Sequence, residues 1–576
     1  MHKRLWLLAG AAVAMLLVAV SATATTTKVS KGTSASLSAA PFAQAWANVP
    51  QTTAGRKAKS VLVFGEEQDV NGFNTNLTCC NQLAGGYLGF NETIRGAYNI
   101  NNKGVHIKDL VSAASANSKT LHFTIKPKAS WYYGGKKLPV TYKDFVYTWK
   151  NIVDPKNDVA GRAGYNQISG YSHQGLKGIT FKWKKCPAGG STPDNPCGPY
   201  ADWQDLFTGV YPSAALAGQD FNKIWTNCIC GPSGPVSDGP FYLSNYTKGQ
   251  GTTLKKNPFW YGKKAGLAEV DFKLVADTNS EVQGMRGGEY DAIAPTFGSN
   301  LLPLKSASGI TFNQIPGYFQ EHIDMQFGKQ GQPLLRAPWM RQAIAMGIDR
   351  KSIIKAVYGD LAGNTVPLNN ILFYSTQASY KADFGKWNYN PTKAKALIAK
   401  HCTGSGTPVT CSGLPAKFRY TWTASNATRT NQEAIVKAEL KDIGIEITDA
   451  ALPANVVFGS TGIPSGNYDL ANFAWVTNGD PGNFYDTWRC GGDSNYLNYC
   501  NRAATRLMDK ANGELNPSKR VALYQAADKL MGNNVPTVPL YQRPVPLIYK
   551  SAVGGMINNP STAGPMWNIE AWRWKS

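Results

Sequence analysis

The sequence of 576 residues lacks the short motifs that mark common hydrolases and nucleotide-binding enzymes. Gly-x-Ser-x-Gly, His-Glu-x-x-His and the Walker loop do not occur. The six histidines are scattered, and no zinc-finger or recognition-helix pattern accompanies the dispersed lysines. These absences predict a protein that is not an enzyme, needs no cofactor and binds no nucleic acid.

Acidic residues are also scarce, since 37 Asp and Glu residues stand against 59 Lys and Arg residues and give a formal net charge of +22. The plain interpretation is a solvated basic surface. The alternative is an affinity for anionic wall polymers, lipid headgroups or an acidic ligand. The chain is 43% hydrophobic and long enough for two or three folded domains.

The N-terminus predicts export. Lys3 and Arg4 precede an apolar run over residues 5–20, and Ala22-Thr23-Ala24 follows as a small-residue cleavage site. Residues 1–24 therefore form a predicted signal peptide, with an uncleaved anchor helix as the alternative. No cysteine follows the apolar run before Cys79, so the sequence does not predict a lipoprotein. Residues 25–57 form a predicted flexible leader.

The ten cysteines suit an oxidising compartment. Three pairs close short loops rich in Gly, Pro, Ser or Asn and predict the disulfides Cys186–Cys197, Cys402–Cys411 and Cys490–Cys500. The remaining four form two doublets, Cys79 with Cys80 and Cys228 with Cys230. Because adjacent cysteines rarely bridge each other, we expect two disulfides between the doublets. A zinc site built from these four cysteines is the competing interpretation.

Residues 237–262 predict a β-hairpin that ends in an aromatic cluster. Gly239-Pro240 breaks the chain, residues 241–243 have strand composition, and residues 248–251 supply the turn before a returning strand. This stretch resembles the sequence signature of the family 5 extracellular solute-binding proteins, the dipeptide and oligopeptide receptors of bacterial ABC importers. The family reads roughly Gly-x-Gly-Pro-Tyr/Phe-x-Leu and then Leu-x-x-Asn-Pro-x-Tyr-Trp, and Asp238 is a mild departure from it.

Other stretches resemble the same family in collinear order over about residues 60–550. Each of these stretches also predicts a strand, a turn or a capped helix from its own residues. They are a strand at 60–64, a strand through 121–125, a Gly134-Gly135 turn, a helix opened by Thr141 with Asp144, two helices over 335–359, a helix after Asn390-Pro391, a helix capped by Thr430 with Glu433 and followed by a parallel strand at 445–447, a last helix after Asn516-Pro517, and a strand at 535–541.

The resemblance implies an α/β, bilobed, periplasmic-binding-protein-like fold of class II with three subdomains and a hinge between the lobes. The expected boundaries are 58–318 for lobe one, with an extra subdomain at about 86–235, then 319–533 for lobe two and 534–576 for the return to lobe one. The chain would cross between the lobes twice.

The expected ligand site lies in residues 472–488, because ligands of open α/β sheets lie beyond the carboxyl ends of strands. This stretch looks like the family's Trp-x-x-Asp-x-x-Asp-Pro loop, whose first Asp pairs with a peptide's α-amino group. Thr477 or Asn478 stands in that slot, so amine recognition falls to Asp480 or Glu66 if it occurs. The candidate ligand-binding residues are Trp475, Thr477, Asn478, Asp480, Tyr485, Trp488, Asn495, Glu66 and Gln68.

Each candidate also has a plain structural role as its alternative. Asp480 precedes a proline and could cap a turn, Trp475 could belong to the core, and Tyr485 with Trp488 could pack under the Cys490–Cys500 loop. No metal ligand and no catalytic set is predicted.

Three functions follow. The first is a monomeric, exported protein at the extracytoplasmic face, in the periplasm or cell wall, that binds a peptide and delivers it to an ABC permease. The second is the same fold with an oligosaccharide, a glycolipid headgroup or an anionic metabolite as ligand, which the missing Asp and the basic charge favour. The third is a secreted hydrolase or a wall-associated structural protein.

Overall fold

The computed structural model describes residues 60–188, 191–192, 195–275 and 277–575. The predicted signal peptide and leader, residues 1–57, lie outside this range. Among the residues described, no helix combines the length and the apolar character that crossing a membrane requires.

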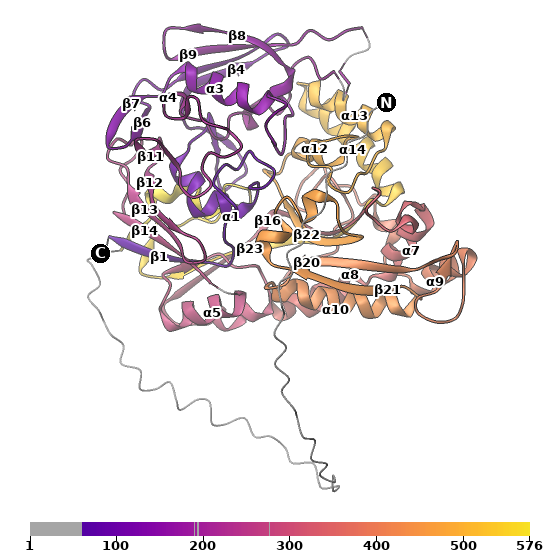
Figure 1. Cartoon of the computed structure of the whole chain (residues 1–576). Coiled ribbons are helices and arrows are strands. Elements are labelled where there is room, and N and C mark those ends of the chain that lie inside the picture. Colours follow the sequence, from indigo (N-terminus) through magenta and orange to yellow (C-terminus); the bar gives the residue numbers. More distant parts are fainter. Residues whose placement is uncertain (1–59, 189–190, 193–194, 276, 576) are drawn as a thin grey trace, which may run out of the picture. The chain divides into compact units, whose positions relative to one another are not determined.

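One ten-stranded sheet runs through the described chain (Figure 1). Its strands in spatial order are β12 (Phe241–Thr247), β13 (Gly251–Lys256), β14 (Glu269–Leu274), β1 (Val61–Glu66), β15 (Ala292–Ile293), β23 (Thr537–Lys550), β16 (Ile310–Met325), β22 (Leu470–Val476), β20 (Lys417–Thr423) and β21 (Glu446–Leu452). Strands β14, β1 and β15 are parallel, and so are β22, β20 and β21. The predicted α/β class is confirmed.

Two long antiparallel strands, β16 and β23, lie between the parallel groups and join them. Their register shifts between Pro316 and Gln320, where the regular pairing with residues 542–544 is interrupted. The two predicted crossings between lobes stay a prediction, for which these strands are the candidates.

Helices cover the sheet, and α5 and α10 lie along its lower side in Figure 1. The longer helices are α3 (Tyr142–Val153), α5 (Thr278–Gly287), α7 (Pro338–Gly347), α8 (Arg350–Tyr358), α9 (Pro391–His401), α10 (Ala427–Asp442), α13 (Arg502–Gly513) and α14 (Pro517–Asn534). Smaller sheets lie within residues 98–237: β2 (Tyr98–Ile100) with β3 (His106–Lys108); β4 (Val111–Ala116), β5 (Thr120–Ile125), β9 (Gly178–Trp183) and β8 (Ile168–Gln174); and β10 (Cys230–Gly231), β11 (Gly234–Ser237), β6 (Ser130–Tyr133) and β7 (Lys136–Pro139).

Most predicted helix starts are confirmed. Thr141 and Asp144 form the predicted capping box of α3, and Asn390 and Asn516 cap α9 and α14. The predicted cap at Thr430 is wrong. Helix α10 begins at Ala427, because Asn426 accepts the backbone N–H of residue 429 at 3.0 Å and Thr430 lies in the first turns of the helix.

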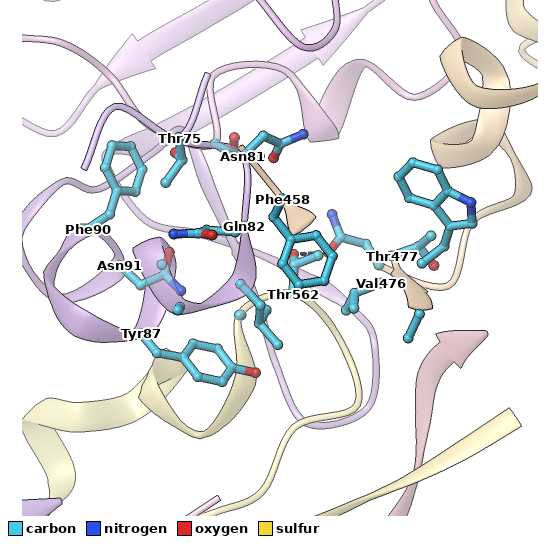
Figure 2. A pocket seen from close by; sticks show the side chains of 18 of the residues that line it. Thr75, Asn81, Gln82, Tyr87, Phe90, Asn91, Phe458, Val476, Thr477 and Thr562 are labelled. Atoms are coloured by element: carbon cyan, nitrogen blue, oxygen red, sulfur yellow. Dashed lines mark hydrogen bonds between the residues drawn. The ribbon is translucent and has the colours of Figure 1, made fainter. Parts of the chain in front are cut away.

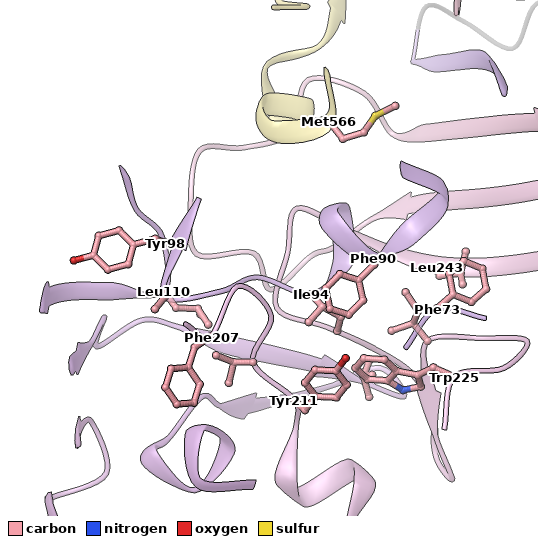
Figure 3. Packing of buried hydrophobic residues seen from close by; sticks show 14 of the residues in the cluster. Phe73, Phe90, Ile94, Tyr98, Leu110, Phe207, Tyr211, Trp225, Leu243 and Met566 are labelled. Carbon is pink, nitrogen blue, oxygen red and sulfur yellow. The ribbon is translucent and has the colours of Figure 1, made fainter. Parts of the chain in front are cut away.

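The buried side chains form three clusters. The first gathers residues of 62–272 with residues of 547–572, and Figure 3 shows Phe90, Tyr211 and Trp225 packed together within it. The indole of Trp225 stacks on Tyr211 with ring centroids 4.7 Å apart. The other two clusters draw mainly on residues 282–548 and 371–531. The second cluster continues across the long strands, because it joins side chains of residues 282–304 to those of residues 323–470 and 535–548.

The three loop-closing disulfides occur as predicted, at Cys186–Cys197, Cys402–Cys411 and Cys490–Cys500. The doublets differ from the prediction, because Cys79 is bonded to Cys80 and Cys228 to Cys230. The two stretches do run side by side, since the backbone N–H of Phe73 donates to the carbonyl of Trp225 at 2.7 Å. The prediction that the two doublets lie near each other is therefore confirmed, but the predicted bonds between them are wrong. Each cysteine is bonded to the other cysteine of its own doublet, which is the nearer one along the chain.

Candidate functional site

A cavity of about 510 Å³ lies between the end of β1, the segment 75–100, the end of β22 with the loop after it, and residues 562–567. In Figure 2, Gln82, Tyr87 and Asn91 lie on one side of this cavity and Phe458 and Thr477 on the other. Its volume falls within the roughly 300–1,000 Å³ typical of small-ligand sites.

Five of the predicted site residues line this cavity. They are Glu66, Gln68, Trp475, Thr477 and Asn478. Trp475 is half-buried at the end of β22, with its ring 6.1 Å from that of Tyr496.

The four other candidates lie outside the cavity lining because each is used in local packing. Asp480 accepts the backbone N–H of Gly482 at 2.8 Å, so its alternative role as a turn cap is confirmed. Trp488 has no exposed surface, and the hydroxyl of Tyr485 donates to a carboxylate of α13 at 2.5 Å. Asn495 holds its own loop, donating to the carbonyls of residues 489 and 499.

Three carboxyl groups gather where β1 ends. Both carboxylate oxygens of Glu67 accept hydrogen bonds from threonine hydroxyls, those of Thr278 and Thr296. Burial, reinforced by the charge of Glu67, raises the pKa of Glu66 to about 8. Burial likewise raises the pKa of Glu281 well above its ordinary value, and neither of its oxygens has a partner among the described residues. At neutral pH, Glu66 is therefore mainly uncharged.

A buried ion pair joins helix α10 to the central strand β16. The guanidinium of Arg429 donates to the carboxylate of Glu321 at 2.8 Å, and both side chains are at most 4% exposed. Burial alone would raise the pKa of Glu321, but the charges of Arg429 and Arg543 hold it below its ordinary value. Arg543, on β23, is farther away, with its nearest guanidinium nitrogen 3.8 Å from Glu321.

A polar network fixes the loop after β22 to residues 106–205. The carboxylate of Asp205 accepts the side-chain amides of Asn478 at 3.1 Å and Asn483 at 2.7 Å, and it pairs with His106 at 2.5 Å. Burial alone would lower the pKa of His106, but the hydrogen bond and charge of Asp205 raise it above its ordinary value. Asn478 is thus held by protein groups rather than left free for a ligand.

A second network lies beside the first. The guanidinium of Arg520, on α14, donates to Asp480 at 2.5 and 2.7 Å and also contacts Asp202 closely. Burial, with the charge of Asp480, raises the pKa of Asp202 well above its ordinary value. The carboxylate of Asp480 is therefore already neutralised by Arg520.

The cavity walls combine amides with aromatic rings. The side-chain amides of Gln68, Asn81 and Asn91 line the cavity and make no hydrogen bond to any described residue. Aromatic side chains complete the walls: Tyr87, Phe90, Tyr98, Phe458, Phe473, Trp475, Phe484, Tyr496 and Trp567. Such walls offer amide hydrogen bonds and apolar area with little specificity for one side chain.

Sequence reasoning missed most of the lining. Arg429 and Arg543 lie in a helix and a strand whose patterns carry no functional signal, and Tyr87 and Asn91 lie in short irregular helices at 83–93. No group of three or more His, Cys, Asp or Glu side chains that could hold a metal occurs in the part of the chain that the structure describes.

Comparison with known proteins gives a consistent result. The family model for bacterial extracellular solute-binding proteins, family 5 Middle, matches residues 108–496. The oligopeptide-binding protein OppA of Mycobacterium tuberculosis (strain ATCC 25618 / H37Rv) is 27% identical over 444 residues, which cover 75% of this chain and 70% of that protein.

Solved structures show the same fold at low identity. The periplasmic EDTA-binding protein EppA has a TM-score of 0.77 and 21% identity, covering 90% of this chain and 98% of its own. The oligopeptide-binding protein AppA from Bacillus subtilis, in complex with a nonapeptide, has a TM-score of 0.77 and 18% identity, covering 90% and 99%. These similarities establish a bilobed, periplasmic-binding-protein-like fold.

Proposed function

Because the chain belongs to family 5 of the bacterial extracellular solute-binding proteins, we propose that it is the exported receptor of an ABC importer and captures a peptide. The observation that carries the proposal is the cavity, where free amides of Gln68, Asn81 and Asn91 stand among aromatic walls. Peptide groups need both donors and acceptors, and a side-chain amide supplies both. The relative OppA is named as an oligopeptide-binding protein, which supports the same ligand class.

We propose that capture occurs by closure of two lobes, 58–318 with 534–576 and 319–533, about the long strands. The register shift at Pro316–Gln320 is the natural place for bending, because the ladder of hydrogen bonds is interrupted there. Contacts across the proposed lobes support a closed form: Arg162 pairs with Asp493 at 3.1 Å, and Asp205 holds the loop after β22.

The same fold with a non-peptide solute is the second candidate. Thr477 or Asn478 fills the slot where the peptide-binding relatives are expected to hold a carboxylate. The hydroxyl of Thr477 is bonded to Tyr374 at 2.9 Å, and the amide of Asn478 to Asp205 at 3.1 Å. EppA, named for EDTA, shows that this fold accommodates other solutes. An oligosaccharide, a glycolipid headgroup or an anionic metabolite would suit the second candidate.

Native mass spectrometry of the protein purified from its host without refolding tests the proposal. A ladder of bound peptide masses on a monomer is the expected result, and a glycan or lipid mass would contradict peptide capture. An Asn81→Ala, Asn91→Ala double variant should lose bound peptide. The matched control is Asn364→Ala, an exposed amide outside the cavity lining. If the control loses bound peptide as well, the loss does not come from the free amides of the cavity.

A further inference from the structure

We infer that Arg543 anchors a carboxylate of the ligand, and that the carboxyl groups around the cavity, already engaged by protein groups, disfavour a ligand ammonium group. The inference rests on the proposed function and narrows its substrate class to acids without a free amine, such as N-acylated peptides with a free C-terminus.

The first step is the unused capacity of Arg543. Its guanidinium makes no hydrogen bond to any described residue, although its side chain is only 12% exposed and lines the cavity. Its Nε is buried without a partner, and its nearest acid, Glu321, is 3.8 Å away and already held by Arg429. The guanidinium lies over the ring of Phe319, 4.5 Å from its centroid, and this contact leaves the N–H donors unused. A guanidinium carries five donors in a fork that matches a carboxylate, so a buried one without hydrogen bonds favours an anionic ligand.

The second step concerns the other hydrogen-bond donors that line the cavity with Arg543. Tyr87 faces the same cavity, and its hydroxyl makes no hydrogen bond to a described residue. Glu66 and Arg543 line the same cavity as Tyr87, and their charges both act on its hydroxyl. With Glu66 mainly protonated, a guanidinium, a phenol and a carboxylic acid present donors to one region. A carboxylate can accept from all three.

The third step is that the carboxylates around the cavity already have partners within the protein. Glu321 is paired with Arg429, and both oxygens of Glu67 accept hydrogen bonds from threonine hydroxyls. Asp109 is paired with Arg95 at 2.6 Å, and Asp480 with Arg520. A desolvated ammonium without a counter-charge is costly, so these assignments select against it.

Glu66 is the group that could reverse this inference, because an ammonium beside it would favour its ionised form. Its burial and the neighbouring charge of Glu67 oppose ionisation. A Glu66→Gln variant separates the cases, since glutamine keeps a donor for a carboxylate but cannot become a counter-charge for an amine.

The experiment is titration calorimetry at pH 7 with matched pools of tetrapeptides: unmodified, N-acetylated, and N-acetylated with a C-terminal amide. Citrate and EDTA serve as non-peptide acids. The proteins are the wild type, Arg543→Gln, Glu66→Gln and the control Arg286→Gln, an exposed arginine on α5. The comparison of pools on the wild type alone is decisive if a variant fails to fold.

The N-acetylated acid pool should bind at least as tightly as the unmodified pool, and amidation should weaken binding tenfold or more. Arg543→Gln should remove the preference for acid over amide, while Arg286→Gln keeps it. Tighter binding of the unmodified pool that Glu66→Gln abolishes, or equal binding of acid and amide, would overturn the inference and leave peptide capture standing. Binding of citrate or EDTA that depends on Arg543, with no peptide bound, would support the anchor and refute peptide capture. If Arg543→Gln weakens the binding of none of these probes, the anchoring role of Arg543 is refuted.

Discussion

Arg520 is the clearest place to test how Asp202 is held against the loop after β22. Its side chain is 11% exposed and pairs with both Asp202 and Asp480, whose side chains are 5% and 30% exposed. In Arg520→Met, Asp480 can be solvated but Asp202 cannot. Leaving one buried charge without its partner costs about 3–5 kcal/mol of the free energy of unfolding.

This cost converts into a modest shift of melting temperature, because the chain is long. The unfolding entropy is about 2.1 cal/mol/K per residue, or on the order of 1 kcal/mol per degree for a protein of this size. Differential scanning calorimetry of Arg520→Met at pH 7.5 should therefore show a melting temperature lower by roughly 3–5 °C. The loss should be smaller at pH 5 than at pH 7.5, because burial raises the pKa of Asp202 and lower pH favours its uncharged form.

A double-mutant cycle with Asp202→Asn tests the cause. If the cost comes from the uncompensated carboxylate, Asp202→Asn added to Arg520→Met should recover most of the loss. Two single losses that simply add in the double variant, or a loss that is equal at pH 5 and pH 7.5, would refute this reasoning.

Three further predictions concern single residues. The pKa of Glu66 is about 8 in the folded state and near 4.5 in the unfolded chain, so ionisation of this group lowers stability as pH rises between these values. Glu66→Gln should therefore raise the melting temperature at pH 8 but not at pH 4. His106 has a raised pKa beside Asp205, so its contribution is full below about 6.5 and is lost as pH rises through the folded value; calorimetry of His106→Gln should show a loss of roughly 1–2 kcal/mol at pH 6 and less at pH 9. Gly564→Ala should destabilise by about 1–3 kcal/mol in chemical denaturation and weaken ligand binding, because its φ is +52° and a Cβ there would lie 2.1 Å from the hydroxyl oxygen of Tyr87; an unchanged denaturation midpoint would contradict this.

Local signals in the sequence predicted most of the fold. The capping box at Thr141 and the Asn-Pro starts of α9 and α14 depend on neighbouring residues only, so their prediction holds. The Thr430 prediction failed because a competing cap, Asn426, lies one turn earlier and reaches the free N–H groups first.

The candidate site was predicted only in part, because its charges are settled by distant partners. Asp480 is a plausible ligand group in sequence, but Arg520, 40 positions later, occupies it. Arg543 reads as one residue of an ordinary strand, and only the distance to Glu321 reveals its unused donors. The bonds within the cysteine doublets are likewise decided by geometry that spacing does not encode.

The position of β23 in the sheet has a consequence for how the chain folds. This strand comes late in the sequence, at residues 537–550, yet it lies in the middle of the sheet between β15 and β16. Until it is available, β15 and β16 each lack a neighbour, and the two parallel groups cannot join. Pairings between positions as far apart as 292 and 549 give a high contact order, which slows folding. The sheet is therefore completed only after nearly the whole chain has been made, so a chain still being synthesised stays open along its middle.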